Sequence, residues 1–167
     1  MKDAPPLPNK LICDAEQIFN EAAVSEEITA ALTSGDPKHS RARVVSILKA
    51  AQKQGRAAIA EALNLRPMAA FEATRSYSWL TDCLVQTVLH YSTDRVHPLS
   101  TPTDSERIAV FAVGGYGRGE MAPQSDVDLL FLTPYKITPW AESVIETTLY
   151  VLWDLKLKIG HASRTVK

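Results

Sequence analysis

Asp126 and Asp128 are the residues whose type and spacing are best suited to chemistry in this sequence. Apolar residues alternate with them through Val127, Leu129 and Phe131, a pattern that predicts a β-strand. Side chains two positions apart on a strand share a face, so the two Cα atoms should lie about 6.6 Å apart. Paired carboxylates repel each other and lose hydration unless a cation neutralises them. Because oxygen ligands favour Mg²⁺ or Mn²⁺ over zinc, the pair predicts a divalent metal site.

A glycine turn precedes the two acids. Residues 108–113 form a continuous apolar, partly β-branched run, which predicts a buried strand. Gly114 and Gly115 then permit positive φ and the close approach of a ligand. Backbone N–H groups in such a turn can bind anionic oxygens. The order of strand, glycine pair, ten further residues and Asp-x-Asp strand predicts a nucleotidyltransferase site, where a metal orients attack on the α-phosphate of a nucleoside triphosphate.

Two other glycine motifs are excluded by the residues that follow. The dinucleotide-binding fingerprint would need glycine at position 120, where the chain has Glu120. The P-loop pattern would need Lys and Ser or Thr, where the chain has Glu120 and Met121. A glycine turn or an Asp-x-Asp pair alone is common, so the prediction depends on their combination.

The motif residues resemble those of a known family, the bacterial PII uridylyltransferase/uridylyl-removing enzymes. The specific similarity begins at Ile108, and the helical stretch up to about Tyr91 has a similar layout to the N-terminal helices of that family. The matching segments are residues 114–120, Pro123, residues 125–130, residues 152–155 and residues 158–165. The adenylyltransferases of glutamine synthetase share the broad pattern, but their glycine segment usually differs.

The resemblance implies Mg²⁺-dependent transfer of UMP from UTP to a tyrosine of the PII signalling protein, with release of diphosphate. By that match Gly114, Gly115 and Ser125 would hold the triphosphate, and Asp126 and Asp128 would bind the metals as the catalytic acids. The family also implies a His-Asp hydrolase domain and ACT domains that sense glutamine as effector. Neither follows within these residues.

The expected fold class is α+β. An N-terminal helical region, residues 1–104, should precede a nucleotidyltransferase domain, residues 105–167, that is incomplete at its C-terminal end. That domain should contain a truncated mixed sheet of the polymerase-beta-like type, with helices on one side. The chain is therefore expected to be an N-terminal fragment.

Helical periodicity and capping signals predict the other elements. One helix should run from residue 14 to about 32, a second should open at Asp36-Pro37, and Gly55 interrupts the second pattern. A third should follow Arg66-Pro67, with its core side formed by Phe71, Leu80, Leu84, Val88 and Tyr91. Thr138-Pro139 should open a further helix, and alternation over residues 155–159 suggests a third strand that Gly160 closes or bulges.

A third carboxylate, which would help to activate the attacking hydroxyl, is not evident. Asp154 is the only acid after Glu146, and its position in an apolar helix makes it a poor candidate. No histidine forms a His-Asp pair, and His161 is the only one we would consider near the site; otherwise it is a surface or hydrogen-bonded residue. The chain is therefore expected to carry a triphosphate and metal half-site without being a competent enzyme alone.

Composition limits the other possibilities. The sequence is 46% hydrophobic and 22% charged with a net charge of −1, which argues against a nucleic-acid partner. No apolar run is long enough for a membrane span and no signal-peptide core is present, so a cytoplasmic location is expected. Cys13 and Cys83 should be free thiols. The alternatives left open are adenylyl transfer to another protein, transfer to a small molecule or RNA, and a catalytically inactive regulatory or scaffold relative.

Overall fold

The computed structural model describes residues 10–34, 36, 39–101 and 103–166. Contacts divide the chain into two compact units, which are described separately below. The first unit comprises the described part of Met1–Leu84 together with Gly119–Gln124, and the second comprises Val85–Arg118 and Ser125–Lys167. The expected division into sequence domains near residue 104 stays a prediction. No helix among the described residues has the length and hydropathy needed to cross a bilayer.

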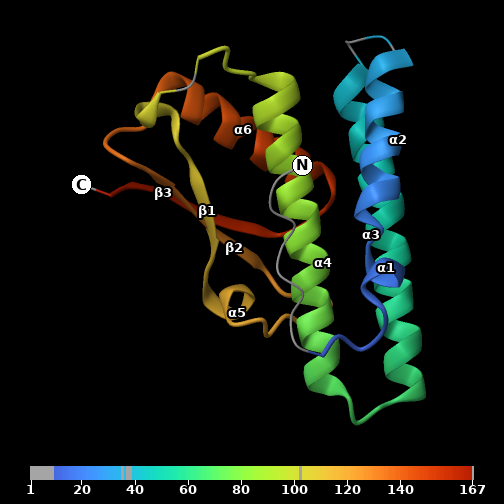
Figure 1. Cartoon of the computed structure of the whole chain (residues 1–167). Helices are drawn as coiled ribbons and strands as arrows, with labels where there is room; N and C mark the ends of the chain where they lie inside the picture. Colours follow the sequence, from blue (N-terminus) through green and yellow to red (C-terminus); the bar gives the residue numbers. More distant parts are fainter. Residues whose placement is uncertain (1–9, 35, 37–38, 102, 167) are drawn as a thin grey trace. The chain divides into compact units, whose positions relative to one another are not determined.

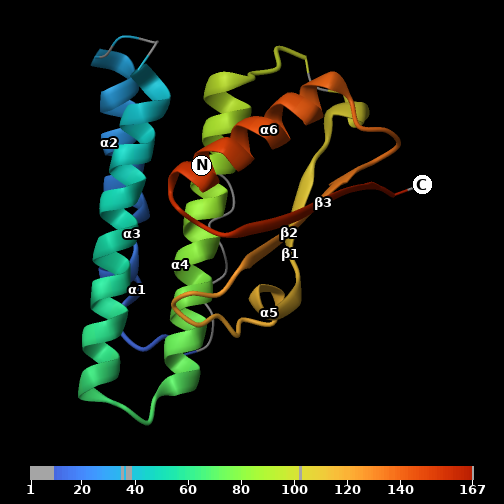
Figure 2. The same ribbon diagram turned by 180° about the vertical axis from the view of Figure 1, so that it is seen from behind.

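The first unit is built from helices. Both α1 (Ala15–Ile18) and α2 (Glu21–Ser34) contact α3 (Ser40–Leu65), as Figures 1 and 2 show from opposite sides. The single helix expected over residues 14–32 is therefore wrong. Phe19 is extended at φ −155°, and the Asn20 side chain accepts a 2.9 Å hydrogen bond from the N–H of Ala23 at the start of α2. Helix α1 ends at this point because the local capping bond begins a new helix.

Helix α3 continues without interruption through Gly55. A Cβ at Gly55 would meet the backbone oxygen of Ile18 well inside van der Waals distance. The glycine thus permits close contact between α1 and α3, and the expectation of a break there is wrong. The cap predicted at Asp36-Pro37 falls partly outside the described residues, and α3 begins at Ser40.

The third predicted helix is α4 (Ala70–His90), which continues into the π-helical turn η2 (Tyr91–Val96). Four of the five predicted core positions are buried, but Phe71 in the first turn is 76% exposed. Helix α4 contributes to both units, because the division falls between Leu84 and Val85.

The second unit contains a three-stranded mixed sheet in the order β1-β2-β3, which confirms the α+β fold class. Strand β1 (Ala109–Ala112) is antiparallel to β2 (Val127–Thr133), and β3 (Ile159–Thr165) is parallel to β2. Helix α6 (Pro139–Asp154) makes the connection that a parallel pair requires, and it contacts β3. Its N-cap is the predicted Thr138, whose side chain accepts a 3.2 Å hydrogen bond from the N–H of Ala141.

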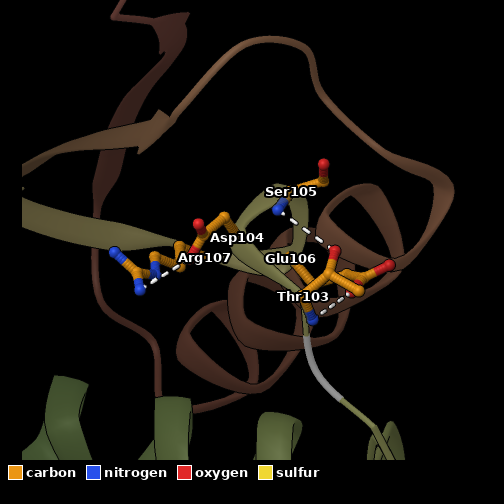
Figure 3. Close-up of polar contacts among 5 residues, drawn as sticks. All are labelled: Thr103, Asp104, Ser105, Glu106 and Arg107. Carbon is orange, nitrogen blue, oxygen red and sulfur yellow. Dashed lines mark hydrogen bonds and ion pairs between the residues drawn. The ribbon is translucent and has the colours of Figure 1, made fainter.

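Strand β1 is exposed, which contradicts the expectation of a buried strand. Phe111 is 49% exposed, and of the four strand residues only Val110 is partly covered. Strand β1 lies at an edge of the sheet, and among the described elements its main contacts are with β2 and the short helix after it, residues 114–117, so no long helix covers its side chains. A capping box at Thr103 and Glu106 fixes the turn that leads into β1 (Figure 3).

Strand β3 begins where the sequence pattern suggested that it would end. Leu155 and Leu157 are buried, but they lie in the turn after α6 rather than in the strand. Lys156 between them has φ +62°, which is incompatible with an extended strand. The alternation of leucines therefore reflects a turn with two buried side chains, and Gly160 is the second residue of β3.

Candidate functional site

Strand β2 places Asp128 on the less covered face of the sheet. Val127, Leu129 and Phe131 are fully buried, and Asp128 alternates with them at a half-buried position. Asp126 is exposed and directly precedes the strand. The predicted alternation is confirmed from Val127 onward, whereas Asp126 lies before the strand, so a shared face for the two acids stays a prediction. Side chains that pair across neighbouring strands share a face, and the pairs here are Phe111–Leu130, Leu130–Ala162 and Asp128–Gly160. Exposed Phe111 and half-buried Leu130 and Ala162 therefore lie on the same face as Asp128.

The glycine turn is in contact with Asp128. The N–H of Val113 donates a 3.0 Å hydrogen bond to the backbone oxygen of Asp128, and the chain then turns into α5 (Gly114–Gly117). Gly114 has φ +62°, as expected for this turn. A Cβ at Gly114 would lie 2.8 Å from Oδ2 of Asp128. The tertiary structure therefore brings the glycine bend and one predicted metal ligand together.

The other glycines of the turn have different roles. Gly115 is inside α5. A Cβ at Gly117 would lie 2.5 Å from the backbone oxygen of Ala112, so this glycine permits the turn to fold back onto β1. Tyr116 is buried and attaches the turn to the unit.

Gly160 lies beside the candidate site, which the sequence did not indicate. It pairs with Asp128 across the parallel β2–β3 ladder, and a Cβ there would overlap Oδ1 of Asp128. The N–H of Val127 donates a 2.8 Å hydrogen bond to the backbone oxygen of Lys158, which fixes this register beside the acid. The sequence pattern indicated only the end or a bulge of a strand, because the pairing of residues 128 and 160 depends on the crossover through α6.

The remaining candidates lie around this arrangement or away from it. Ser125 is half-buried before Asp126, and its role stays a prediction. His161 follows Gly160 and so points to the opposite face, where its ring lies 6.2 Å from that of Trp153 in an edge-to-face contact. His161 therefore takes the surface position and not the position near the site. No cluster of three or more metal-binding side chains occurs within the described ranges.

The donor set fits a hard divalent cation. A carboxylate at the start of a strand, with a Cβ-free turn against one oxygen, offers an oxygen ligand beside that turn. Asp126 supplies a second carboxylate two residues before it. Two carboxylates separated by one residue, next to a glycine turn, are the kind of donor set that a hard divalent cation accepts.

Comparisons with known proteins agree on the kind of domain. The family model described as "Glutamate-ammonia ligase adenylyltransferase" matches residues 1–159. No solved structure matches the chain.

Several curated relatives carry the name bifunctional uridylyltransferase/uridylyl-removing enzyme. The protein of Ruegeria pomeroyi is 60% identical over 90% of this chain and 17% of its own length. The protein of Cereibacter sphaeroides is 52% identical over 97% of the chain and 18% of its own length, and that of Caulobacter vibrioides is 49% identical over 91% and 16%. The chain thus spans less than a fifth of the length of these relatives. The family model covers residues 1–159 of the 167, so the chain belongs to the nucleotidyltransferase family that this model describes, and over about nine-tenths of its length it is similar to part of the bifunctional uridylyltransferase/uridylyl-removing enzymes.

Proposed function

We propose that this chain carries the UTP- and Mg²⁺-binding half-site of a uridylyltransferase. The observation that supports this most directly is that the Asp128 carboxylate lies against the backbone of Gly114, where a Cβ would come within 2.8 Å of Oδ2. The names of the relatives point to uridylyl transfer. Mn²⁺ is expected to replace Mg²⁺, because both accept hard oxygen ligands.

In this proposal the residues of the chain bind and orient the nucleotide. Asp126 and Asp128 hold the metal, which when bound neutralises phosphate charge and aligns the α-phosphate for attack. Gly114 and Gly115 allow the triphosphate to approach the backbone, since no Cβ stands in its way. Ser125, next to the acids, donates its hydroxyl hydrogen to a phosphate oxygen.

The receiving group and the partners extend the proposal to the whole protein. A tyrosine of the PII signalling protein would accept UMP, with release of diphosphate, and glutamine would act as effector outside the matched segment. The third carboxylate needed for turnover also stays a prediction. For this reason the first test is nucleotide binding by the chain and not turnover.

Calorimetric titration of the chain with UTP, with Mg²⁺ and then with EDTA, tests the half-site. We expect Mg²⁺ to raise the affinity for UTP at least about tenfold. Asp128→Asn or Asp126→Asn should remove this increase. Glu146→Gln is the matched control, because it removes one negative charge from an exposed position on α6. UTP binding that is absent, or equally tight in EDTA, would refute the proposal and favour an inactive scaffold.

Adenylyl transfer is the second candidate, because the matching family model is described as an adenylyltransferase. Both candidates use the same acids and the same turn, so within this chain they differ in the base that is accepted, and in the whole protein they differ in the acceptor. Titration with ATP under the same conditions separates them. Tighter Mg²⁺-dependent binding of ATP than of UTP would favour adenylyl transfer.

A further inference from the structure

We propose that Gly160 is a positioning residue for the metal ligand Asp128. The proposal deepens the proposed function and rests on it, because it assigns a role to the strand opposite the glycine turn. The side chain of Asp128 lies between two positions that lack a Cβ, Gly114 after β1 and Gly160 in β3. One carboxylate oxygen occupies the space of each missing Cβ.

The contact at Gly160 is the closer of the two. A Cβ built there would overlap Oδ1 of Asp128, and its next neighbour would be Cγ of the same residue at 3.5 Å. No other atom lies within van der Waals distance of that position among the described residues. The space left by the missing side chain at Gly160 is therefore occupied by the carboxylate of Asp128 alone.

The backbone of Gly160 does not require glycine. Positive φ occurs at Gly114 and Gly119 among the described glycines, whereas Gly160 lies in the regular register of β3. Glycine within a strand is normally unfavourable, because it loses more conformational freedom on folding than alanine and packs no side chain. A glycine here is explained by the need for space beside Asp128.

The position of this carboxylate determines whether it can bind a metal. Groups that bind a metal must be held within about 0.5 Å of their working position. A methyl group at residue 160 would force Oδ1 of Asp128 away by an amount on the order of 1 Å. Asp128 is a short side chain that can rotate, so this displacement should alter the ligand geometry without breaking the strand.

Gly160→Ala in the 167-residue chain tests this role, with Ala162→Ser as the matched control. Ala162 lies two residues further along β3 on the same face, and it pairs with Leu130 instead of Asp128. Each substitution adds one heavy atom. The affinity for UTP is measured with Mn²⁺ and in EDTA, and the thermal unfolding midpoint is measured without metal.

We expect Gly160→Ala to reduce the Mn²⁺-dependent gain in UTP affinity about tenfold, while UTP affinity in EDTA is unchanged. The unfolding midpoint of metal-free Gly160→Ala should remain within about 3 °C of the original protein. Ala162→Ser should keep the Mn²⁺-dependent gain. In an Asp128→Asn background, adding Gly160→Ala should change nothing further.

Three results would overturn this role. The first is that Gly160→Ala keeps the full Mn²⁺-dependent gain in UTP affinity. The second is that Ala162→Ser loses as much of this gain as Gly160→Ala does. The third is that Gly160→Ala also loses UTP affinity in EDTA and has a much lower unfolding midpoint. The failure of the proposed function is distinguishable, because the original protein would then show no Mn²⁺-dependent gain at all.

Discussion

Gly114→Ala should separate backbone strain from damage to the metal site when it is compared with Gly119→Ala. Gly114 has φ +62° and Gly119 has φ +71°, so alanine is disfavoured at both positions. The left-handed conformation costs an L-residue about 1–2 kcal/mol, and the smaller freedom of the unfolded chain returns about 0.4–1 kcal/mol. The free energy of unfolding of both variants should be lower by about 1 kcal/mol, which lowers the unfolding midpoint by about 2–4 °C in a chain of this size.

The two glycines differ in their neighbours. A Cβ at Gly114 would lie 2.8 Å from Oδ2 of Asp128, whereas a Cβ at Gly119 would have nothing within 4 Å. Only Gly114→Ala should displace the carboxylate. We therefore expect similar thermal midpoints for the two variants, but a loss of Mg²⁺-dependent UTP binding in Gly114→Ala alone.

Thermal unfolding without metal and calorimetric titration with Mg²⁺ and UTP measure the two effects separately. Retention of the Mg²⁺-dependent binding by Gly114→Ala would show that the contact between the turn and Asp128 is not part of the site. A much lower midpoint in Gly114→Ala than in Gly119→Ala would show that crowding at residue 114 disturbs the fold as well.

Two further predictions concern stability. Alanine usually stabilises a helix interior by about 1 kcal/mol relative to glycine, but Gly55→Ala should destabilise the chain by about 1–2 kcal/mol, because its Cβ would overlap the backbone oxygen of Ile18. A raised unfolding midpoint would contradict this prediction. Ala60→Gly, at an exposed position of α3, is the control. Burial raises the pKa of the Cys83 thiol above its ordinary 9.0, so the folded chain retains a proton that the unfolded chain loses. The free energy of unfolding should therefore decrease above pH 9 by up to about 1.4 kcal/mol per pH unit because of this group. In denaturant titrations at pH 9 and 10, the free energy of unfolding of Cys83→Ala should decrease less steeply with pH.

Much of the local structure follows from sequence patterns. The β2 alternation from Val127 to Phe131 predicts which side chains are buried, because successive residues of a strand face opposite sides. Thr138-Pro139 predicts the start of α6, because the capping bond and the ring of proline act within one turn. Helix breaks and the start of β3 were less predictable, since Asn20 and Lys156 determine them through conformations that leave little trace in hydrophobic periodicity.

By itself, the sequence determined the combination of a glycine turn with two acids, and from that combination the kind of chemistry. Residue types and spacing carry this information because the turn and the strand are local structures. The tertiary structure decided that Asp128 lies between Gly114 and Gly160, that His161 faces away, and that β1 is exposed. These facts depend on strand order and on the register set by the crossover through α6, which joins residues far apart in the chain.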